Sequence, residues 1–175
     1  LLVSSAASDV YKRQLNDAAK NRDNADLFCR LVKGADVLID DFAPSSPCQT
    51  LVDAAWLRSL NPRLVSCSIT AFGKRGPLKD EPPIDDLVLA RMGVLGGMPG
   101  FRPAPVHVVH PLPTVGSALL ACLGIASSLL AREATGRGRA VETTMMAGAL
   151  LYHPKVLGEH TVSYTHLTLP TIPGV

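Results

Sequence analysis

The chain has 175 residues, of which 47% are hydrophobic and 18% are charged, with 17 basic and 15 acidic side chains. This nearly neutral balance gives no electrostatic basis for binding nucleic acid or an anionic membrane, and an aromatic content of 5% argues against a base-stacking surface. The four cysteines show no CxxC spacing, so we expect buried thiols in the reducing cytoplasm and no metal site.

The two ends of the chain have related coding sequences. Residues 9–14 can be encoded by GATGTGTATAAGAGACAG and residues 162–166 by GTCTCTTATACACAT, and these strings are reverse complements over their shared length. A sequencing adaptor read through on both sides produces this relation, whereas a pair of natural termini has no reason to. We therefore expect residues 1–14 and 162–175 to be translated adaptor and residues 15–161 to be the native part, a single partial domain.

Short apolar strands alternate with helices in the first half of the native part. Apolar side chains at helical spacing predict a helix over residues 24–33, which Gly34 ends. Residues 35–39 are predicted to be a buried strand, residues 50–60 a second helix, and residues 64–70 a second buried strand. This alternation is typical of a parallel α/β sheet.

The second half adds three predicted helices and two predicted strands. The helices are residues 85–93, 114–133 and 144–152, and the strands are residues 106–109 and 140–143. Gly136 follows the longest helix and is a natural left-handed C-cap. Residues 115–131 are apolar or small throughout. A stretch of about 17 residues is at the short limit for a membrane span, so we expect a helix buried on all sides, with a small membrane-associated protein as the weaker alternative.

Several segments, in a fixed order, resemble motifs of the family III CoA-transferases. Residues 35–44 (ADVLIDDFAP) resemble the pattern A-D-V-x-[VI]-E-N-F-[RK]-P, and residues 61–73 (NPRLVSCSITAFG) resemble N-P-R-L-[IV]-x-x-S-I-[ST]-x-F-G. The dipeptide G-P follows at residues 76–77, and residues 124–138 resemble G-I-L-A-A-L-x-A-R-x-x-T-G-R-G. Residues 141–143 continue like V-[DE]-[VT]. Each match is weak alone, but together they cover nearly all of the native part.

The resemblance implies the fold and the chemistry. The expected fold is α/β, a partial Rossmann-like parallel sheet with flanking helices and an incomplete fragment of the family's large domain. Family members transfer coenzyme A between an acyl-CoA and a carboxylic acid through an aspartyl anhydride, so coenzyme A is a substrate and acyl carrier, with none tightly bound. The resemblance further implies an interlocked homodimer, or a tandem second half, in the parent protein.

The family's nucleophilic aspartate aligns with Thr114, at the start of the long helix, or with Pro113 at the spacing of the related racemases. No Asp or Glu occurs between Leu87 and Arg132, and the sequence identifies no base beside the Thr114 hydroxyl, so this residue is expected to be only a helix N-cap. Asp85 aligns with an acidic residue that lies near the substrate in the formyl-CoA enzymes. Helix capping by Asp85 or Asp86 is an equally good interpretation.

The resemblance also assigns the coenzyme A contacts, to Lys20, Asp41, Phe42, Ala43 and Lys74. Lys20 aligns with a lysine that resembles a phosphate contact, for which a flexible ammonium is suited. The family has Asn, Phe and a basic residue at the positions of Asp41, Phe42 and Ala43. Replacing Asn by Asp removes two hydrogen-bond donors and adds a negative charge. The positive charge of Lys74 is expected to compensate for these unfavourable changes in coenzyme A binding. For both lysines the alternative is a solvated surface side chain.

Two hypotheses therefore remain for the function. In the first, the chain is a fragment of an acyl-CoA:carboxylate CoA-transferase whose parent protein is active. In the second, it is a catalytically degenerate half that acts as a scaffold for a competent partner. Under either hypothesis the isolated fragment is expected to aggregate, because sheet edges and apolar helix faces are left uncovered.

Overall fold

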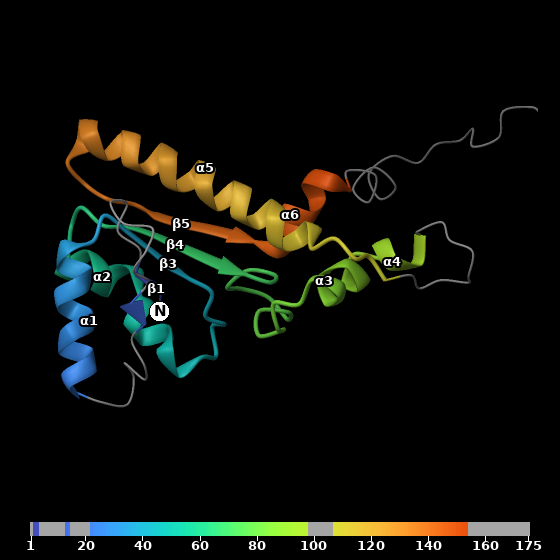
Figure 1. Cartoon of the computed structure of the whole chain (residues 1–175), viewed down its shortest axis with the longest axis horizontal. Helices are drawn as coiled ribbons and strands as arrows, with labels where there is room; N and C mark the ends of the chain where they lie inside the picture. Colours follow the sequence, from blue (N-terminus) through green and yellow to red (C-terminus); the bar gives the residue numbers. More distant parts are fainter. Residues whose placement is uncertain (1, 4–12, 15–21, 98–106, 154–175) are drawn as a thin grey trace, which may run out of the picture.

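A computed structural model of the chain describes residues 2–3, 13–14, 22–97 and 107–153. Three parallel strands, β3 (Val37–Asp40), β4 (Val65–Thr70) and β5 (Ala140–Thr144), form one sheet in the order β3-β4-β5. Because all three strands run in the same direction, their carboxyl ends meet at one edge of the sheet (Figure 1). The predicted parallel α/β arrangement is therefore confirmed.

A separate antiparallel pair is formed by β1 (Leu2–Val3) and β2 (Arg13–Gln14). Each of these strands has two residues, and both lie in the segment predicted to be translated adaptor. They do not join the three-stranded sheet.

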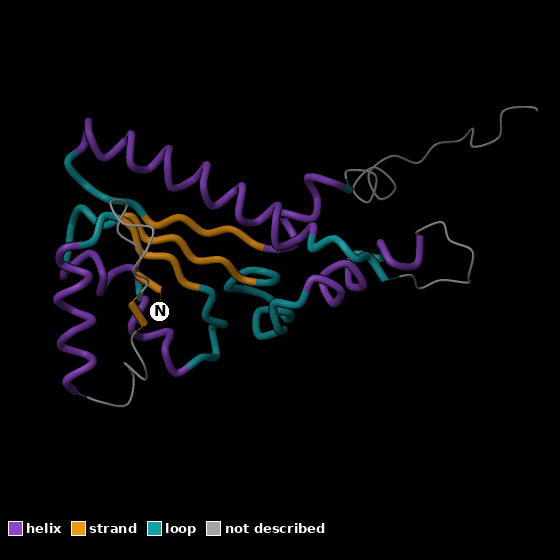
Figure 2. The backbone as a smooth tube through the Cα atoms, viewed as in Figure 1, coloured by secondary structure: helices purple, strands orange, loops and turns teal. Residues whose placement is uncertain are grey.

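Helices α1 (Arg22–Gly34) and α2 (Ala54–Leu60) lie on one side of the sheet (Figure 2). The apolar stripe predicted for the first helix contributes Phe28 and Val32 to a buried cluster, in which the ring of Phe28 stacks on Trp56 with centroids 6.1 Å apart. The other buried members of this cluster are Leu38, Val52, Leu57 and Leu64.

The helix predicted over residues 50–60 is divided in two. A 3-10 helix, η1 (Pro47–Val52), precedes α2, and Asp53 lies between them in an extended conformation. The carboxylate of Asp53 accepts hydrogen bonds from the backbone N–H groups of Ala55 and Trp56, at 3.0 and 2.8 Å. An aspartate in this geometry starts a new helix, which explains the break.

Helices α5 (Leu112–Thr135) and α6 (Met145–Tyr152) lie on the other side of the sheet (Figure 1). The two helices approach so closely where Gly116 faces Gly148 that a Cβ atom on either glycine would collide with the backbone of the other helix. Gly124 lies against the side chain of Val141 on β5. As predicted, Gly136 ends α5 with a φ of 67°, and its N–H donates to the carbonyl of Arg132.

The expectation that this helix is buried on all sides is wrong. Val115, Leu119, Leu123 and Leu130, here called the outer stripe of α5, have exposed fractions of 44%, 56%, 65% and 76%. The physical reason is that the described sheet and helices cover only one side of α5, and the outer stripe lies on the side that they leave open. Among the described residues, α5 is also the one helix whose length and composition suffice to cross a membrane, although here it packs along the sheet.

Arg132 anchors the C-terminal end of α5 to the starts of two strands. Its side chain is 10% exposed and pairs with the Asp36 carboxylate, with Nη2 2.9 Å from Oδ1. Its Nη1 also donates to the backbone carbonyl of Arg63 at 3.1 Å. The arginine of the family-like segment 124–138 therefore holds the helix against the sheet.

Helices α3 (Asp85–Arg91) and α4 (Val94–Gly97) lie beyond the carboxyl ends of the strands (Figure 1). They pack on α6 through a second buried cluster, which consists of Ala71, Val88, Leu89, Val94, Met145 and Ala149. The strand predicted over residues 106–109 is wrong where it can be compared, because residues 107–110 form no strand and residue 106 lies outside the described part.

Candidate active site

The two residues assigned to catalysis from sequence, Asp85 and Thr114, are in direct contact. The backbone N–H of Thr114 donates to Oδ1 of Asp85 at 2.8 Å, and the Thr114 hydroxyl donates to Oδ2 at 2.8 Å. Asp85 is the first residue of α3, and Thr114 is in the first turn of α5. The carboxylate of Asp85 thus links the start of α3 to the start of α5.

Neither residue occupies the N-cap position of its own helix. Ile84 precedes α3 and Pro111 precedes α5, and neither makes a side-chain capping bond. Asp85 instead satisfies a free N–H group of the neighbouring helix, because the first four N–H groups of a helix have no partner within it. The local capping predicted for Thr114 and Asp85 is therefore replaced by a contact between helices.

This contact supplies a base that the sequence did not reveal. The Thr114 hydroxyl hydrogen points to a carboxylate that is only half-buried, while Thr114 itself is exposed. The two residues are 29 positions apart in the sequence, and no spacing rule connects residues at that separation. Only the packing of α3 against α5 brings them together.

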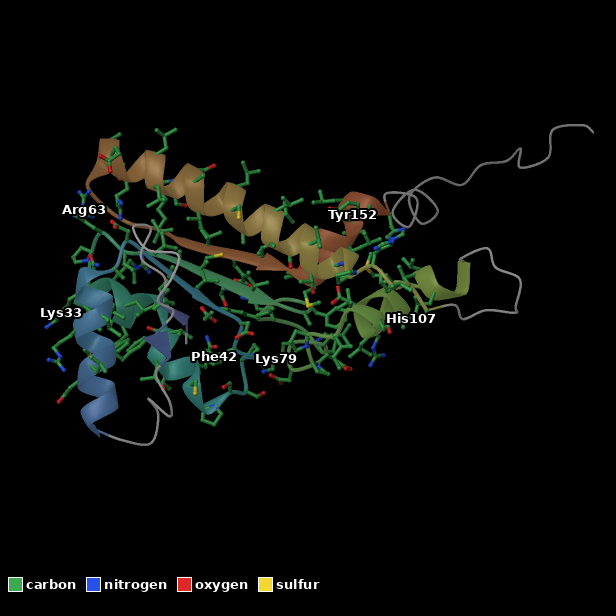
Figure 3. The ribbon with its side chains drawn as sticks, viewed as in Figure 1. Lys33, Phe42, Arg63, Lys79, His107 and Tyr152 are labelled. Atoms are coloured by element: carbon green, nitrogen blue, oxygen red, sulfur yellow. The ribbon has the colours of Figure 1, made fainter. Side chains whose placement is uncertain are left out.

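The neighbouring carboxylate has a different partner. Asp86 Oδ2 lies 2.7 Å from Nδ1 of His107, so adjacent residues of α3 face separate groups; Figure 3 shows His107 near α3. No cluster of three or more potential metal ligands occurs in the part of the chain that the structure describes. A shallow depression elsewhere lies on α1, away from α3, and is lined by Asp26, Cys29, Arg30 and Lys33.

The segment assigned to coenzyme A leaves the carboxyl end of β3. Asp41 is exposed, and Phe42 is half-buried against the cluster beneath α1 and α2. Figure 3 shows Phe42 on the loop that follows β3. The carbonyl of Ala43 accepts a hydrogen bond from the N–H of Ser46 at 2.9 Å, which closes a turn. Lys20 lies outside the described residues.

Lys74 lies on the loop that leaves the adjacent strand, β4. Its backbone N–H donates to Oε1 of Glu142 on β5 at 3.2 Å. Gly73 precedes it with a φ of 100°, a conformation that favours glycine, and donates to the Thr70 hydroxyl at 3.0 Å. The Lys74 loop and the Asp41–Phe42–Ala43 loop therefore follow neighbouring strands at the same edge of the sheet.

A buried carboxyl group lies between these loops. Asp40, the last residue of β3, is 5% exposed and accepts a hydrogen bond from the Ser68 hydroxyl at 3.0 Å. Burial raises the pKa of Asp40, and the hydrogen bond from Ser68 and the positive charge of Lys74 partly offset this. Burial, followed by the negative charge of Asp40, raises the pKa of the adjacent Cys67 thiol to about 11. Cys67 is therefore a protonated core thiol and not a nucleophile.

A comparison with protein families matches residues 17–168 to the model of CoA-transferase family III. Among characterised proteins, the chain is 33% identical over 135 residues to the acetyl-CoA:oxalate CoA-transferase of Acetobacter aceti, which covers 76% of this chain and 34% of that protein. It is 29% identical to the succinyl-CoA–L-malate CoA-transferase beta subunit of Chloroflexus aurantiacus, over 77% of this chain and 33% of that protein. The chain thus spans about a third of the length of these relatives.

The fold is similar to that of solved structures. The crystal structure of Rv3272 from M. tuberculosis matches with a TM-score of 0.73 and 29% identity, over 81% of this chain and 40% of that one. A CAIB/BAIF family protein from Brucella suis matches with a TM-score of 0.70 and 25% identity, over 83% of this chain and 39% of that one. The described sheet and helices therefore correspond to part of a larger fold.

Proposed function

This chain belongs to CoA-transferase family III, and on that premise we propose that it is part of an enzyme that transfers coenzyme A from an acyl-CoA to a carboxylic acid. The relatives named above act, by their names, on acetyl-CoA with oxalate and on succinyl-CoA with L-malate. A short-chain acyl-CoA and a small dicarboxylate are the corresponding substrates proposed for the parent protein of this chain.

The observation that carries the proposal is the arrangement of two loops at the carboxyl edge of the sheet. Parallel α/β sheets bind ligands outside the carboxyl ends of their strands. At this edge the Asp41–Phe42–Ala43 loop follows β3 and the Lys74 loop follows β4, and these strands are adjacent. We propose that Phe42 and Lys74 contact coenzyme A here, with the ammonium of Lys74 near a phosphate.

The proposed transfer proceeds through an acyl-enzyme anhydride. A carboxylate attacks the thioester carbonyl, and coenzyme A leaves as a thiolate that later returns. Such a step needs an ionised carboxylate and donors that face the developing oxyanion. The carboxylate of Asp85, held at the start of α5, belongs to α3, which lies beyond the same carboxyl edge of the sheet that the two loops leave.

The scaffold hypothesis has its own supporting observation. Thr114 stands at the position of the family's nucleophile, and the outer stripe of α5 offers a partner a largely apolar surface. Under this hypothesis the chain is a degenerate half, and a tandem or dimeric partner carries out the transfer.

The experiment uses the intact parent protein with an acyl-CoA donor and a panel of acceptor acids. Acetyl-CoA and succinyl-CoA are each incubated with oxalate, malate or glutarate, and mass spectrometry identifies the thioesters formed. The proposal predicts a thioester of the acceptor and the free acid of the donor in equal amounts. Hydrolysis to free coenzyme A, or no change for every pair, would contradict the proposal.

A further inference from the structure

We propose that Asp85 is the covalent nucleophile of this chain and that Thr114 positions it. The inference rests on the proposed transferase function and assigns its central residue. In this assignment the reactive carboxylate is supplied by α3, although it lies against the start of α5.

The contacts of Asp85 suit this role. Both of its carboxylate oxygens accept a hydrogen bond from the same residue, at 2.8 Å each, so the group is held in one orientation. Each carboxylate oxygen can accept a second hydrogen bond, so lone pairs remain for attack. The side chain is half-buried and not sealed in the core, which leaves a route for a thioester carbonyl.

Three other carboxylates near the carboxyl edge of the sheet are engaged differently. Asp40 is 5% exposed and holds a hydrogen bond within the sheet. Asp86 pairs with His107, and Glu142 accepts the N–H of Lys74. None of the three contacts Thr114 in the described part of the chain, and residues 87–132 contain no acidic residue at all.

Thr114 itself is the less suitable nucleophile. Its hydroxyl would have to lose a proton to Asp85 during attack, and the product would be a stable ester. Attack by Asp85 needs no proton transfer and gives a mixed anhydride, which a thiolate cleaves readily. The pair therefore favours Asp85 as the attacking group and Thr114 as the donor that orients it.

The proposed steps balance. A lone pair of the Asp85 carboxylate forms a bond to the thioester carbonyl carbon, the C–S bond breaks, and coenzyme A leaves as a thiolate. The thiolate attacks the Asp85 carbonyl of the anhydride and releases the donor acid as its carboxylate, which leaves an Asp85 thioester. The acceptor carboxylate attacks this thioester and expels the thiolate, which then attacks the acceptor carbonyl of the second anhydride. Asp85 is regenerated as a carboxylate, and no proton, oxidant or reductant is required.

The test is to trap the acyl-enzyme on the intact parent protein. The protein is incubated with acetyl-CoA or succinyl-CoA and hydroxylamine, without an acceptor acid, digested and mapped by mass spectrometry. A hydroxamate on Asp85 supports the assignment. A hydroxamate on another carboxyl group, an acyl ester on Thr114, or no modified residue overturns it.

Two variants test the assignment of Asp85 independently of the trapping experiment. Asp85→Asn keeps a side chain of the same shape and is expected to lower kcat by at least about 1,000-fold, since it removes the nucleophile. Asp86→Asn is the matched control on the same turn and is expected to stay within about threefold of wild type. Equal losses in the two variants, at unchanged thermal stability, would contradict the assignment.

Two substitutions of Thr114 test whether its hydroxyl positions Asp85. Thr114→Val removes the hydroxyl donor but keeps the backbone N–H, and is expected to lower kcat about 10- to 100-fold with little change in KM. Thr114→Ser restores the donor and most of kcat. If valine and serine are equally impaired, the hydroxyl does not position Asp85.

The trapping result is separate from the test of the overall function. Because no acceptor is present, a hydroxamate on Asp85 would stand even if no acceptor in the panel were used. Conversely, acceptor thioesters formed without any modification of Asp85 would keep the transferase function and remove this assignment.

Discussion

The hydroxyl of Ser68 on β4 donates a hydrogen bond of 3.0 Å to Oδ1 of Asp40, the last residue of β3. Burial raises the pKa of this carboxyl group above its ordinary value of 3.8. The folded state therefore holds the Asp40 proton to a higher pH than the unfolded state does. The sign follows directly: the contribution of Asp40 to stability falls as the pH rises from the ordinary value through the raised pKa.

Replacing Asp40 by Asn is expected to remove this pH dependence. Asparagine keeps an oxygen that accepts the Ser68 hydrogen bond but carries no charge, so the variant should gain stability relative to wild type as the pH rises from acidic to neutral. Urea unfolding of the intact protein at several pH values measures this difference. Asp26, exposed on α1, serves as the control, because its charge is not among those that shift the pKa of Asp40, and Asp26→Asn should shift stability little at any pH. A difference for Asp40→Asn that is the same at all pH values would rule out the buried charge as its cause.

The cysteines are expected to differ sharply in reactivity. Cys67 is completely buried and its thiol has a pKa of about 11, whereas Cys122 is exposed on α5. Alkylation of the native intact protein with iodoacetamide at mildly alkaline pH should label Cys122 and spare Cys67 until denaturant is added, as read by peptide mass mapping. Rapid labelling of Cys67 in the native protein would show that β4 is not the central, covered strand.

The contact between α5 and α6 is expected to tolerate no side chain. Gly116→Ala places a Cβ against the Gly148 backbone, and such overpacking costs about 1–3 kcal/mol. Gly124→Ala on the same helix meets a methyl group of Val141 at 2.6 Å, which can shift, and alanine favours a helix over glycine by about 1 kcal/mol. The melting temperature of the intact protein should therefore fall clearly more for Gly116→Ala. Equal losses in melting temperature for the two variants would mean that α5 and α6 are not in close contact at Gly116 and Gly148.

The outer stripe of α5 is expected to control solubility of the isolated piece. Residues 15–161 expressed alone should aggregate, because the leucines of this stripe stay exposed. Changing Leu119, Leu123 and Leu130 to Gln should raise the soluble fraction after centrifugation. Changing the exposed alanines 118, 126 and 134 to Gln adds the same polar groups without removing leucine, and should help less. A sharp cooperative melt of the unaltered piece would refute this expectation.

Much of the sheet could be predicted because its first two strands are short, rich in apolar residues and separated by helical patterns. Residues 35–39 and 64–70 lie next to helical stripes, and that alternation permits few arrangements other than parallel strands. The helix boundary at Asp53 was missed because an aspartate within an apolar pattern gives no certain sign of whether it caps a new helix or faces solvent. The exposure of the outer stripe was missed for another reason: an apolar sequence indicates what a helix prefers to bury, not whether a neighbour covers it.

The candidate site was predictable only as separate residues. The resemblance assigned Asp85 and Thr114 individually, but each was interpreted through its own helix, because capping rules act over a few residues. A hydrogen bond across 29 positions depends on how two helices pack, and no local pattern encodes it. Lys20, assigned with the coenzyme A contacts, lies outside the described residues and stays a prediction.

Helix α5 has 24 residues without a break, and a straight helix rises about 1.5 Å per residue. Thr114 near one end and Arg132 near the other are thus separated by about 27 Å along a single stiff rod. The ion pair between Arg132 and Asp36 therefore helps to set the position of the Asp85 carboxylate, the proposed nucleophile, from the opposite end of the domain. A substitution that weakened only the ion pair between Arg132 and Asp36 would therefore shift the start of α5 without changing any side chain of the proposed site.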